Sequence, residues 1–471
     1  GPDPVPVHGL MKVLLVKPWN LSDHIQPSLG LGYLATAIRG RHEVAILDCI
    51  RENIRIEGLE ALLRESRPDV LGLQCYTFDL RFVLQAVQAA KRVSRETVTV
   101  VGGPHPSALP EDLFHRAGED LDFAFVGEAE TGFSMLLDAL WDGRAEYRAI
   151  PGLVWRDGGR IRSKLPAFPE DLDALGMPAW DIIRPETYPE SQHGAFYRQF
   201  PIAPIMVTRG CPYPCTFCAG HVVSGRKIRR RSAGHVLAEI RRLNRDFGIQ
   251  EFHVVDDNFT QDRDYAKDFL RQLKAMDLGM SWAVPNGVRM DTLDGELLGL
   301  MKDTGLYLIS LGIESGSDRM LKLMRKGMTT GGIRASVRMI REAGIDMAGF
   351  FILGYPGETV ETIRETIRFS VELPLKRANF FTYLPFPGSE SFRMLQAGGR
   401  LREVDWERFY FMNAAYVPEG LTRKALKRRQ RLAFLRFYAR PGILAYQIRS
   451  IRSLRHLYYL AKRFFHWIVM K

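Results

Sequence analysis

Short hydrophobic runs alternate with stretches of helical periodicity in the first third of the chain. The runs predict five strands, at residues 12–16, 43–47, 69–75, 97–102 and 122–126. Between them, hydrophobic residues recur every three or four positions and predict helices at residues 29–39, 80–93 and 131–140. Strands and helices that alternate at this spacing predict a parallel sheet covered on both faces, which is a doubly wound, Rossmann-like α/β domain. Its ligand is expected at the carboxyl ends of the strands.

A second alternating series begins near residue 202. It predicts six strands, at residues 202–208, 251–255, 281–284, 306–312, 348–353 and 379–384. A helix is expected after Ser232, a suitable N-cap, because hydrophobic residues from Val236 to Phe247 share one face. Six strand–helix units predict an incomplete parallel barrel, a partial (β/α)6 fold of the TIM type. Barrels of this type carry their chemistry at the carboxyl ends of the strands.

Length and composition divide the chain further. At 471 residues, with 46% hydrophobic and 25% charged residues, the chain is expected to form two or three globular domains. We predict a cloning remnant at 1–10, a Rossmann-like domain at 11–142, a connector with a small hairpin at 143–200, the barrel at 201–400 and a basic helical region at 401–471. No secretory signal and no uncharged apolar run of about 18 residues is found, so no membrane span is expected. A cytoplasmic location follows, with Cys49 and Cys75 as buried thiols.

The positive charge is concentrated at the C-terminal end. The net charge is +11, yet residues 420–471 contain fourteen Lys and Arg and no acidic residue, which leaves −3 for the preceding 419 residues. Aromatic residues are interleaved with these cations, as in an interfacial helix on anionic lipid. Nucleic acid is disfavoured as a partner, because no recognisable RNA-binding module accompanies the charge. A packed helical cap and a peripheral membrane contact both stay open.

Three of the five cysteines stand in one short segment. Cys211, Cys215 and Cys218 have the spacing C-x3-C-x2-C. Three thiolates on one loop suit three irons of a four-iron, four-sulfur cluster and leave the fourth iron open. Zinc is the alternative, since His221 would complete a Cys3His set. A disulfide is less favoured, because the motif holds an odd number of cysteines.

The cysteine segment, with Phe217 in the aromatic place before the last cysteine, resembles the signature of the radical S-adenosylmethionine (SAM) enzymes. Further segments match that family, in its order, at the ends of the later strands, and together they outweigh zinc. The resemblance implies a 4Fe–4S cluster on Cys211, Cys215 and Cys218, with SAM chelating the open iron. It also implies that polar side chains hold the amino and carboxylate groups of SAM and that rigid loops hold its adenine. The implied SAM contacts are Phe217, Asp256, Asp257, Asn258, Asn286, Arg289, Glu314, Ser315, Gly354 and Pro385.

Segments 27–35, 101–107 and 126–130 resemble the cobalamin-binding domain that is fused to many radical SAM enzymes. The resemblance extends over roughly residues 11–400 and implies cobalamin contacts at Trp19, Leu29, Gly30, Tyr76, Thr77, Gly102, Gly103, His105, Pro106, Gly127 and Glu128. One segment departs from the family pattern. Domains that ligate cobalt carry a histidine and, further along, a glycine in the loop after the second strand, but in this chain Ile50 stands in place of that histidine and Asn53 in place of that glycine. Cobalamin would therefore bind without a protein histidine on cobalt. The alternative is an empty domain kept for packing.

The resemblance implies an enzyme in which reductive cleavage of SAM gives a 5′-deoxyadenosyl radical that abstracts hydrogen from an unactivated carbon, with cobalamin handing over a methyl group. A C-methyltransferase acting on a hydrophobic, lipid-like or tetrapyrrole-like small molecule is the expectation, with an external one-electron reductant as partner. A radical SAM cyclase or ring-rearranging enzyme, or one with an empty cobalamin domain, is the alternative. Methylthiotransferases are disfavoured, since only Cys49 and Cys75 remain for a second cluster. A non-enzymatic metal protein that binds nucleic acid is disfavoured too. The sequence identifies no catalytic proton donor.

Overall fold

The structure is a computed structural model that describes residues 10–20, 25–144, 146–192, 196–410 and 412–469. The predicted cloning remnant lies outside the described residues, except for Leu10. The described chain forms two compact units. The first contains residues 10–20 and 28–183, and the second contains 25–27 and the residues from 184 onward. The predicted limits of the domains stay predictions.

The first unit is built on one mixed sheet with the order β2-β1-β3-β4-β5-β6-β7. Its strands are β1 (Lys12–Lys17), β2 (Glu43–Asp48), β3 (Val70–Gln74), β4 (Val98–Gly102), β5 (Phe123–Phe125), β6 (Leu153–Asp157) and β7 (Arg160–Ser163). The first five are parallel, as expected from the alternating pattern. Because the strand order reverses between β1 and β3, the carboxyl ends of these two strands form the switch point at which doubly wound folds bind ligands.

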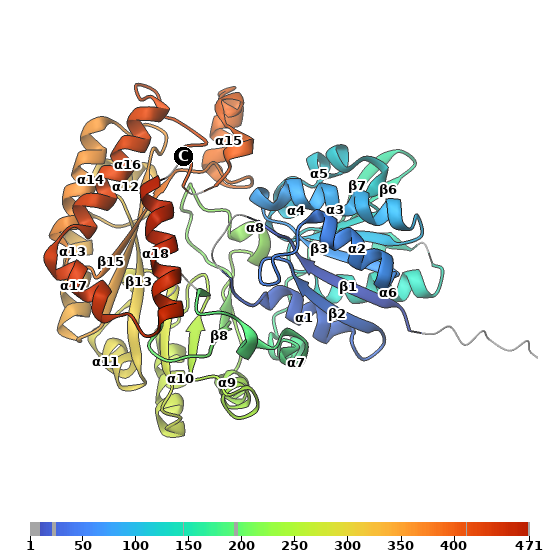
Figure 1. The fold of residues 1–471 in the computed structure, drawn as a ribbon, viewed down its shortest axis with the longest axis horizontal. Helices are drawn as coiled ribbons and strands as arrows, with labels where there is room; N and C mark the ends of the chain where they lie inside the picture. The colour runs from blue at the N-terminus through green and yellow to red at the C-terminus, as the bar shows by residue number, and fades with distance from the viewer. Residues whose placement is uncertain (1–9, 21–24, 145, 193–195, 411, 470–471) are drawn as a thin grey trace, which may run out of the picture. The chain divides into compact units, whose positions relative to one another are not determined.

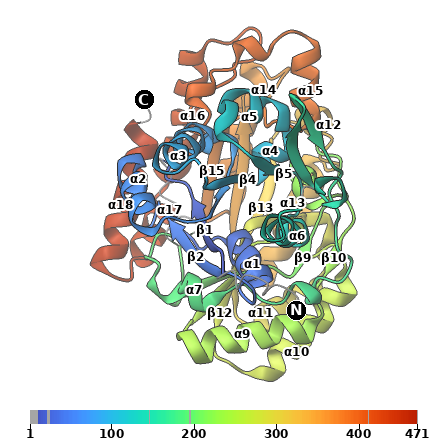
Figure 2. The same cartoon turned by 90° about the vertical axis from the view of Figure 1, so that its right-hand side faces the viewer.

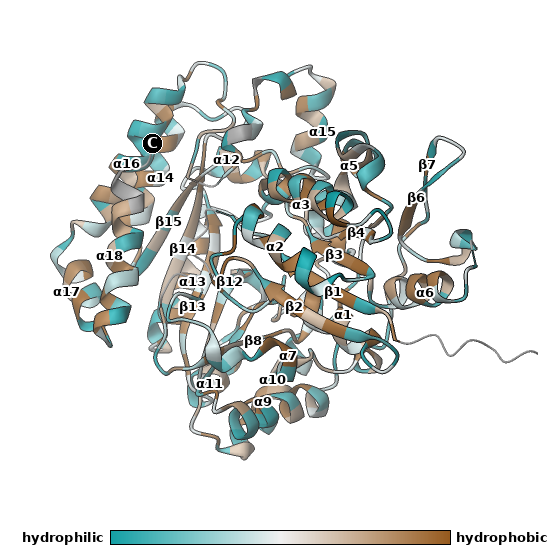
Figure 3. Ribbon diagram, turned by 45° about the vertical axis from the view of Figure 1, so that its right-hand side comes forward, coloured by the Kyte–Doolittle hydropathy of each residue, from teal (hydrophilic) through white to brown (hydrophobic). Residues whose placement is uncertain are grey.

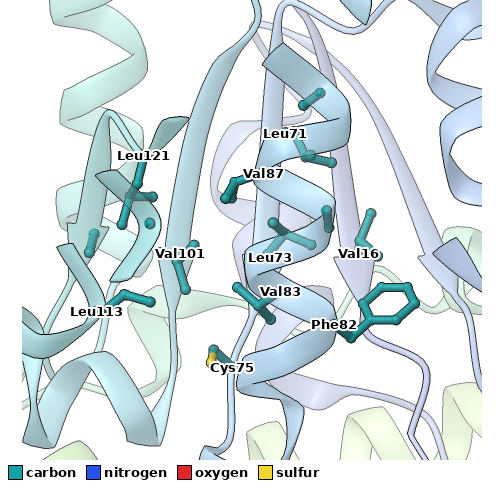
Figure 4. Close-up of a cluster of buried hydrophobic side chains, with 14 of the residues drawn as sticks. Val16, Leu71, Leu73, Cys75, Phe82, Val83, Val87, Val101, Leu113 and Leu121 are labelled. Carbon is teal, nitrogen blue, oxygen red and sulfur yellow. The ribbon is translucent and has the colours of Figure 1, made fainter. Parts of the chain in front are cut away.

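Helices cover both faces of this sheet. On one face lie α1 (Leu29–Ile38) and α6 (Glu130–Trp141), and on the other lie α2 (Ile56–Ser66), α3 (Leu80–Val93) and α5 (Pro110–Ala117). Figure 4 shows Val83 and Val87 of α3 close to Leu71 and Leu73 of β3. Cys49 and Cys75 are buried, as predicted. The doubly wound fold is thus confirmed.

The hairpin expected around residues 154–160 is present as β6 and β7. Strand β6 pairs antiparallel with β5, so the hairpin extends the first sheet. The segment that follows ends in α7 (Trp180–Ile183), which also belongs to the first unit. Residues 146–183 thus lie in the same compact unit as the five parallel strands.

The second unit contains a six-stranded parallel sheet in which every strand neighbours the next along the chain. Its strands are β8 (Ile202–Ile205), β11 (Glu251–Val254), β12 (Ser281–Val288), β13 (Leu306–Glu314), β14 (Asp346–Leu353) and β15 (Arg377–Thr382). The connecting helices are α9 (Ala233–Phe247), α10 (Arg263–Met276), α11 (Gly295–Asp303), α13 (Thr330–Glu342) and α14 (Val360–Glu372). Figure 1 shows α13 and α14 outside the strands β13 and β15, and the partial (β/α)6 barrel is confirmed.

The basic C-terminal region folds as α16 (Arg423–Tyr438), α17 (Pro441–Arg449) and α18 (Leu454–Val469). Helix α16 covers edge strand β15, where Gln430 Nε2 donates to the Phe380 carbonyl at 2.7 Å and the Tyr438 hydroxyl donates to the Ala378 carbonyl at 3.0 Å. In Figure 2 the helices α16, α17 and α18 lie on the same side of β15. The packed-cap interpretation therefore holds for α16, and none of the described helices is long and apolar enough to span a membrane.

Candidate functional site

The three cysteines lie on a loop that leaves the first strand of the barrel. A two-stranded ribbon, β9 (Thr208–Arg209) and β10 (Arg229–Arg230), closes the base of this loop by antiparallel pairing. Inside the ribbon the Cys211 amide donates to the Gly225 carbonyl at 3.3 Å. A side chain at Gly210, where φ is 93°, would collide with the Lys227 carbonyl, so only glycine fits at this close approach. We call residues 210–228 the cysteine loop.

Asp256 anchors the start of the cysteine loop. One carboxylate oxygen accepts from the Val207 amide at 2.8 Å, and the other accepts from both the amide and the hydroxyl of Thr208. Asp256 is buried, and burial raises its pKa to about 7 although these hydrogen bonds act in the opposite direction. Both oxygens are therefore engaged by the protein, a positioning contact that the sequence did not reveal.

Thr216 anchors the middle of the same loop. Its amide donates to the Met324 carbonyl at 3.0 Å, and its own carbonyl accepts from the Ser391 amide at 2.8 Å. Its hydroxyl shares a 2.7 Å hydrogen bond with the Tyr355 hydroxyl. Met324 follows α12 (Asp318–Leu323), and Ser391 lies in α15 (Glu390–Ala397), so three distant parts of the barrel meet at this threonine.

Around these anchors the cysteines remain accessible. Cys211 and Cys215 are half-buried, and Cys218 is exposed. A methyl group at Gly220 would lie 3.6 Å from both Cys218 Sγ and Asp257 Oδ1, which places Asp257 beside the cysteines. Within the described ranges, no three His, Cys, Asp or Glu side chains are arranged to hold a single metal ion. A four-iron cluster instead takes one thiolate on each of three irons, and three thiols on an anchored, accessible loop fit that donor set.

Arg289, at the end of β12, stacks on the cysteine loop. Its guanidinium carbon lies 3.5 Å from the ring centroid of Tyr213. The Asp291 carboxylate accepts from Nε at 2.9 Å and from Nη2 at 2.7 Å, while the buried Nη1 has no partner. Burial lowers the pKa of Arg289, but Asp291 outweighs it and the pKa lies above its usual value. One donor of a fixed cation is thus available for a carboxylate.

Glu314, at the end of β13, pairs with a lysine that the sequence analysis missed. Lys326 Nζ donates to Glu314 Oε1 at 2.8 Å, and both side chains are buried. Nζ also lies 5.9 Å from the Phe217 ring centroid. Burial lowers the pKa of Lys326, but Glu314 and Cys215 raise it above its usual value. Nothing in the run from Met320 to Lys326 separates this lysine from an ordinary surface charge.

The remaining predicted SAM residues differ in their surroundings. Asn258 is buried with Oδ1 unpartnered, and the Asn286 amide donates to the Val255 carbonyl at the neighbouring strand end. Ser315 hydrogen-bonds with Thr366 of α14, and Gly354 packs on Leu426 of α16. The buried residues also include Pro385. Their assignments as SAM contacts stay predictions.

In the first unit, several predicted residues gather at the carboxyl ends of β1 and β3. Ser28, the N-cap of α1, donates from its hydroxyl to Gln74 Oε1 at 2.7 Å. The predicted Leu29 and Gly30 follow in the first turn, and no atom lies within 4 Å of a methyl group placed at Gly30. Tyr76 is 40% exposed and stacks on Phe78. An open glycine and an exposed ring at the switch point fit a broad, flat ligand.

The loop after β4 is compact because glycines hold it close to β3. Gly102 accepts from the Cys75 amide at 2.8 Å. Gly103 has φ of 111°, and a methyl group there would meet the Cys75 carbonyl at 3.0 Å. In the loop after β5, Gly127 has φ of 72°, and a methyl group there would lie 2.5 Å from Pro166. Glu128, next along the chain, is half-buried.

His105 lies in the short helix α4 (Pro104–Ala108) and is 2% exposed. Its Nδ1 hydrogen-bonds with the predicted Thr77 at 3.3 Å, and Pro106 beside it is buried. Burial lowers the pKa of His105 to about 4. The predicted contact of His105 with cobalamin stays a prediction, and its side chain is buried beneath the loop.

The segment after β2 shows how this unit departs from a cobalt-ligating loop. Ile50, in the histidine place, is buried. Asn53, in the glycine place, adopts φ of 52°, a conformation that asparagine tolerates better than most residues. Its Oδ1 accepts from the indole of the predicted Trp19 at 3.2 Å. The glycine place of this loop thus has a left-handed backbone, and the histidine place holds a buried isoleucine.

Comparison with known proteins agrees with both units. The Radical SAM superfamily model matches residues 205–370, and the B12 binding domain model matches residues 22–137. An uncharacterised methyltransferase of Pyrococcus horikoshii is 30% identical over 468 residues, which cover 96% of this chain and 100% of the relative. The chain belongs to the cobalamin-dependent radical SAM methyltransferase family. The cofactors of this family are a 4Fe–4S cluster, SAM and cobalamin, so the chain is an enzyme of that class.

Two further relatives of this radical SAM enzyme carry more specific names. The cytidylyl-2-hydroxyethylphosphonate methyltransferase of Streptomyces wedmorensis is 31% identical and covers 81% of each chain. The anaerobic magnesium-protoporphyrin IX monomethyl ester cyclase of Rubrivivax gelatinosus is 27% identical over 91% of this chain and 77% of the cyclase. The solved structure of OxsB, a cobalamin-dependent SAM radical enzyme, has a TM-score of 0.74 and 17% identity, covering 96% of this chain and 70% of OxsB. This last likeness shows the fold.

Proposed function

We propose that the protein methylates an unactivated carbon of a small molecule. The observation that carries this proposal is a cysteine loop anchored by Asp256 and Thr216 at the carboxyl end of a barrel, in a chain that also has a B12-binding domain. When bound, the cluster and SAM supply one-electron chemistry and cobalamin supplies a transferable methyl group. Cys211, Cys215 and Cys218 would hold the cluster.

The protein's own residues position SAM in this proposal. Arg289 offers its unpartnered Nη1 to the SAM carboxylate, and the stack on Tyr213 keeps the guanidinium from turning away. Glu314 has one oxygen committed to Lys326, and its other oxygen accepts from the ribose hydroxyls. Asp257, which lies beside the cysteines, receives the SAM ammonium. An external one-electron reductant completes the system.

For the substrate we propose a hydrophobic molecule. The relative named after magnesium-protoporphyrin IX monomethyl ester supports a hydrophobic substrate, whereas the phosphonate methyltransferase supports a polar one. The exposed apolar residues of the basic helices α17 and α18 favour a hydrophobic substrate. The same cyclase keeps ring formation open as the second candidate reaction.

We also propose that the C-terminal helices contact anionic lipid. Among the described side chains of these helices, four apolar ones are at least 60% exposed, namely Ile448, Leu454, Tyr458 and Phe465. They are interleaved with cations in a segment that lacks acidic residues, so both hydrophobic insertion and charge attraction favour a negatively charged bilayer. In Figure 3 helix α18 is a mixture of hydrophilic and hydrophobic residues, as expected for an interfacial helix.

Anaerobic reconstitution tests the main proposal. Protein expressed with cobalamin and loaded with iron and sulfide is expected to hold a cluster and about one corrin per chain. With a reductant and methyl-labelled SAM it should form 5′-deoxyadenosine and transfer label to a compound in a lipid extract. Cleavage of SAM without bound corrin would contradict methylation and leave the empty-domain alternative. Label transfer only to polar compounds would contradict the hydrophobic substrate.

A further inference from the structure

A buried arginine lies at the end of the barrel opposite the cysteine loop. Arg377 is the first residue of β15, whereas the cysteine loop follows the carboxyl end of β8, so the length of a strand separates the two. The side chain of Arg377 is 6% exposed, and its Nε is buried without a hydrogen-bond partner. Within the described parts of the chain, its guanidinium makes no hydrogen bond and no ion pair. Buried charges are normally paired, and this one is not.

An aromatic ring covers one face of this guanidinium. The guanidinium carbon of Arg377 lies 3.1 Å from the ring centroid of Phe196. The edge of the guanidinium, which carries its N–H groups, is therefore the part that a partner would meet. Burial lowers the pKa of Arg377 to about 9, and the charge of Arg463 in α18 acts in the same direction. Arg377 still carries its positive charge near neutral pH.

The carboxylates at this end of the barrel are bound by tyrosine hydroxyls. Asp346, the first residue of the neighbouring strand β14, accepts from the Tyr446 hydroxyl of α17 at 2.9 Å. Glu251, the first residue of β11, accepts from the Tyr307 hydroxyl of β13 at 2.8 Å. Neither carboxylate forms an ion pair with Arg377, so its charge is left for a partner from outside the protein.

Further cations gather around the same tyrosines. The guanidinium carbon of Arg198 lies 5.7 Å from the ring centroid of Tyr307, and Lys376 Nζ lies 5.4 Å from that of Tyr446. Burial raises the pKa of Tyr446, and the charges of Arg377 and Arg198 lower it, which places both cations near its hydroxyl. Among the described residues, these cations outnumber the two carboxylates. An excess of positive charge at one position favours an anion with more than one negative charge.

We propose that these cations bind a phosphate group, with Arg377 as the central contact and Arg463 beside it. The edge of a guanidinium presents parallel N–H donors whose spacing matches two phosphate oxygens. The phosphate belongs to a free compound or to the headgroup of an anionic lipid, since Tyr446 of α17 and Arg463 of α18 border the site. This inference is independent of the cluster and of methyl transfer.

The test measures how inorganic phosphate binds to the full-length, reconstituted protein, by anaerobic isothermal titration calorimetry at constant ionic strength. Wild-type protein is expected to bind one phosphate per chain. Arg377→Met should bind it at least about tenfold more weakly, because a hydrogen-bonded charge contact is lost. Arg334→Met is the matched control, since Arg334 also lies over a phenylalanine ring, that of Phe369, but is paired with Glu372. The control should bind phosphate as the wild type does.

The melting temperature gives a second measurement. Without phosphate, Arg377→Met should be at least as stable as the wild type, because methionine removes an unpaired buried charge. Added phosphate should stabilise the wild type and the control more than Arg377→Met, since a ligand stabilises the folded state that binds it. No binding to the wild type, or equal binding and equal stabilisation in Arg377→Met, overturns the inference. If Arg377→Met does not fold, Arg463→Gln decides: weaker phosphate binding supports the site, and unchanged binding contradicts it.

Vesicles of phosphatidylglycerol distinguish the two sources of the phosphate. If the site holds a lipid headgroup, Arg377→Met binds these vesicles more weakly than Arg334→Met does, and inorganic phosphate at constant ionic strength competes with the vesicles for the wild type. If the site holds a free compound, both variants bind the vesicles equally and differ only in their affinity for inorganic phosphate. Either result supports a phosphate site and assigns its source.

Discussion

Thr208 donates two hydrogen bonds to one carboxylate oxygen of Asp256, from its amide at 2.6 Å and from its hydroxyl at 2.7 Å. The other oxygen accepts from the Val207 amide at 2.8 Å. The first cysteine follows Thr208 by three residues, so one buried side chain from the second strand of the barrel fixes the entry of the cysteine loop. The aspartate thus acts on the cluster site through the backbone.

Asp256→Asn is expected to weaken this entry. Asparagine has one acceptor oxygen, so at least one of the three donors is left buried without a partner, at a cost of about 1–3 kcal/mol. Iron content after reconstitution and the free energy of unfolding should both fall, and both are directly measurable. Asp303→Asn on the exposed surface serves as control. Full iron content and unchanged stability in Asp256→Asn would argue against an anchoring role.

Cys215→Ala should abolish SAM cleavage, because a cluster held by two thiolates lacks the ligand set of the proposed site. The chain offers a matched control in Cys49→Ala, which removes a buried thiol of the first unit. The measured quantity is 5′-deoxyadenosine formed per chain under reducing, anaerobic conditions. The control variant should retain it, and persistence of the product in Cys215→Ala would exclude Cys215 as a cluster ligand.

Gly312→Ala is expected to separate Glu314 from Lys326. The new methyl group would lie 2.6 Å from one partner and 2.7 Å from the other, so both side chains must move. The KM for SAM should rise about tenfold, because the buried Glu314 carboxylate would lose its cation. Gly295→Ala is a suitable control, because nothing lies within 4 Å of a methyl group there. If Gly312→Ala bound SAM as tightly as the wild type, the pair would not determine SAM affinity.

The strands of both parallel sheets and the cysteine loop were predictable because they depend on local patterns. Hydrophobic runs gave all six barrel strands, and the glycine place of the β2 loop was recognised although Asn53 fills it. The contacts that organise the site were not predictable. Asp256 and Asp257 are adjacent in sequence, yet one is buried behind the cysteine loop and the other is exposed beside it.

The contacts that the sequence did not reveal join residues that are far apart along the chain. Arg289 stacks on Tyr213 across 76 residues, and no periodicity encodes which ring a guanidinium will meet. Lys326 lies among other charged residues, and only a bend with two left-handed residues turns it inward.

The contribution of Glu358 to stability is expected to fall as the pH rises from about 4.5 to about 8. Burial raises the pKa of Glu358 from 4.5 to about 8, against hydrogen bonds from the Gly354 and Tyr355 amides. The folded state therefore binds more protons than the unfolded state in this window, and ionisation favours unfolding. Glu358→Gln should flatten the dependence and be more stable than the wild type at pH 9, by on the order of 1 kcal/mol or more. Parallel melting profiles of both proteins at pH 6 and pH 9 would contradict this assignment.

The C-terminal helices are expected to bind vesicles of anionic lipid and not vesicles of neutral lipid. Leu454 is 87% exposed, and Leu454→Glu replaces an inserting side chain by one that the bilayer surface repels. Co-sedimentation with phosphatidylglycerol vesicles should weaken by about tenfold in this variant and also fall in the wild type as salt is raised, since the attraction of surface cations is screened. Met394→Glu on α15 is the matched control, because Met394 is also an exposed apolar residue but lies outside the basic helices. Equal loss in both variants, or equal binding to neutral vesicles, would show that the C-terminal helices do not recognise an anionic surface.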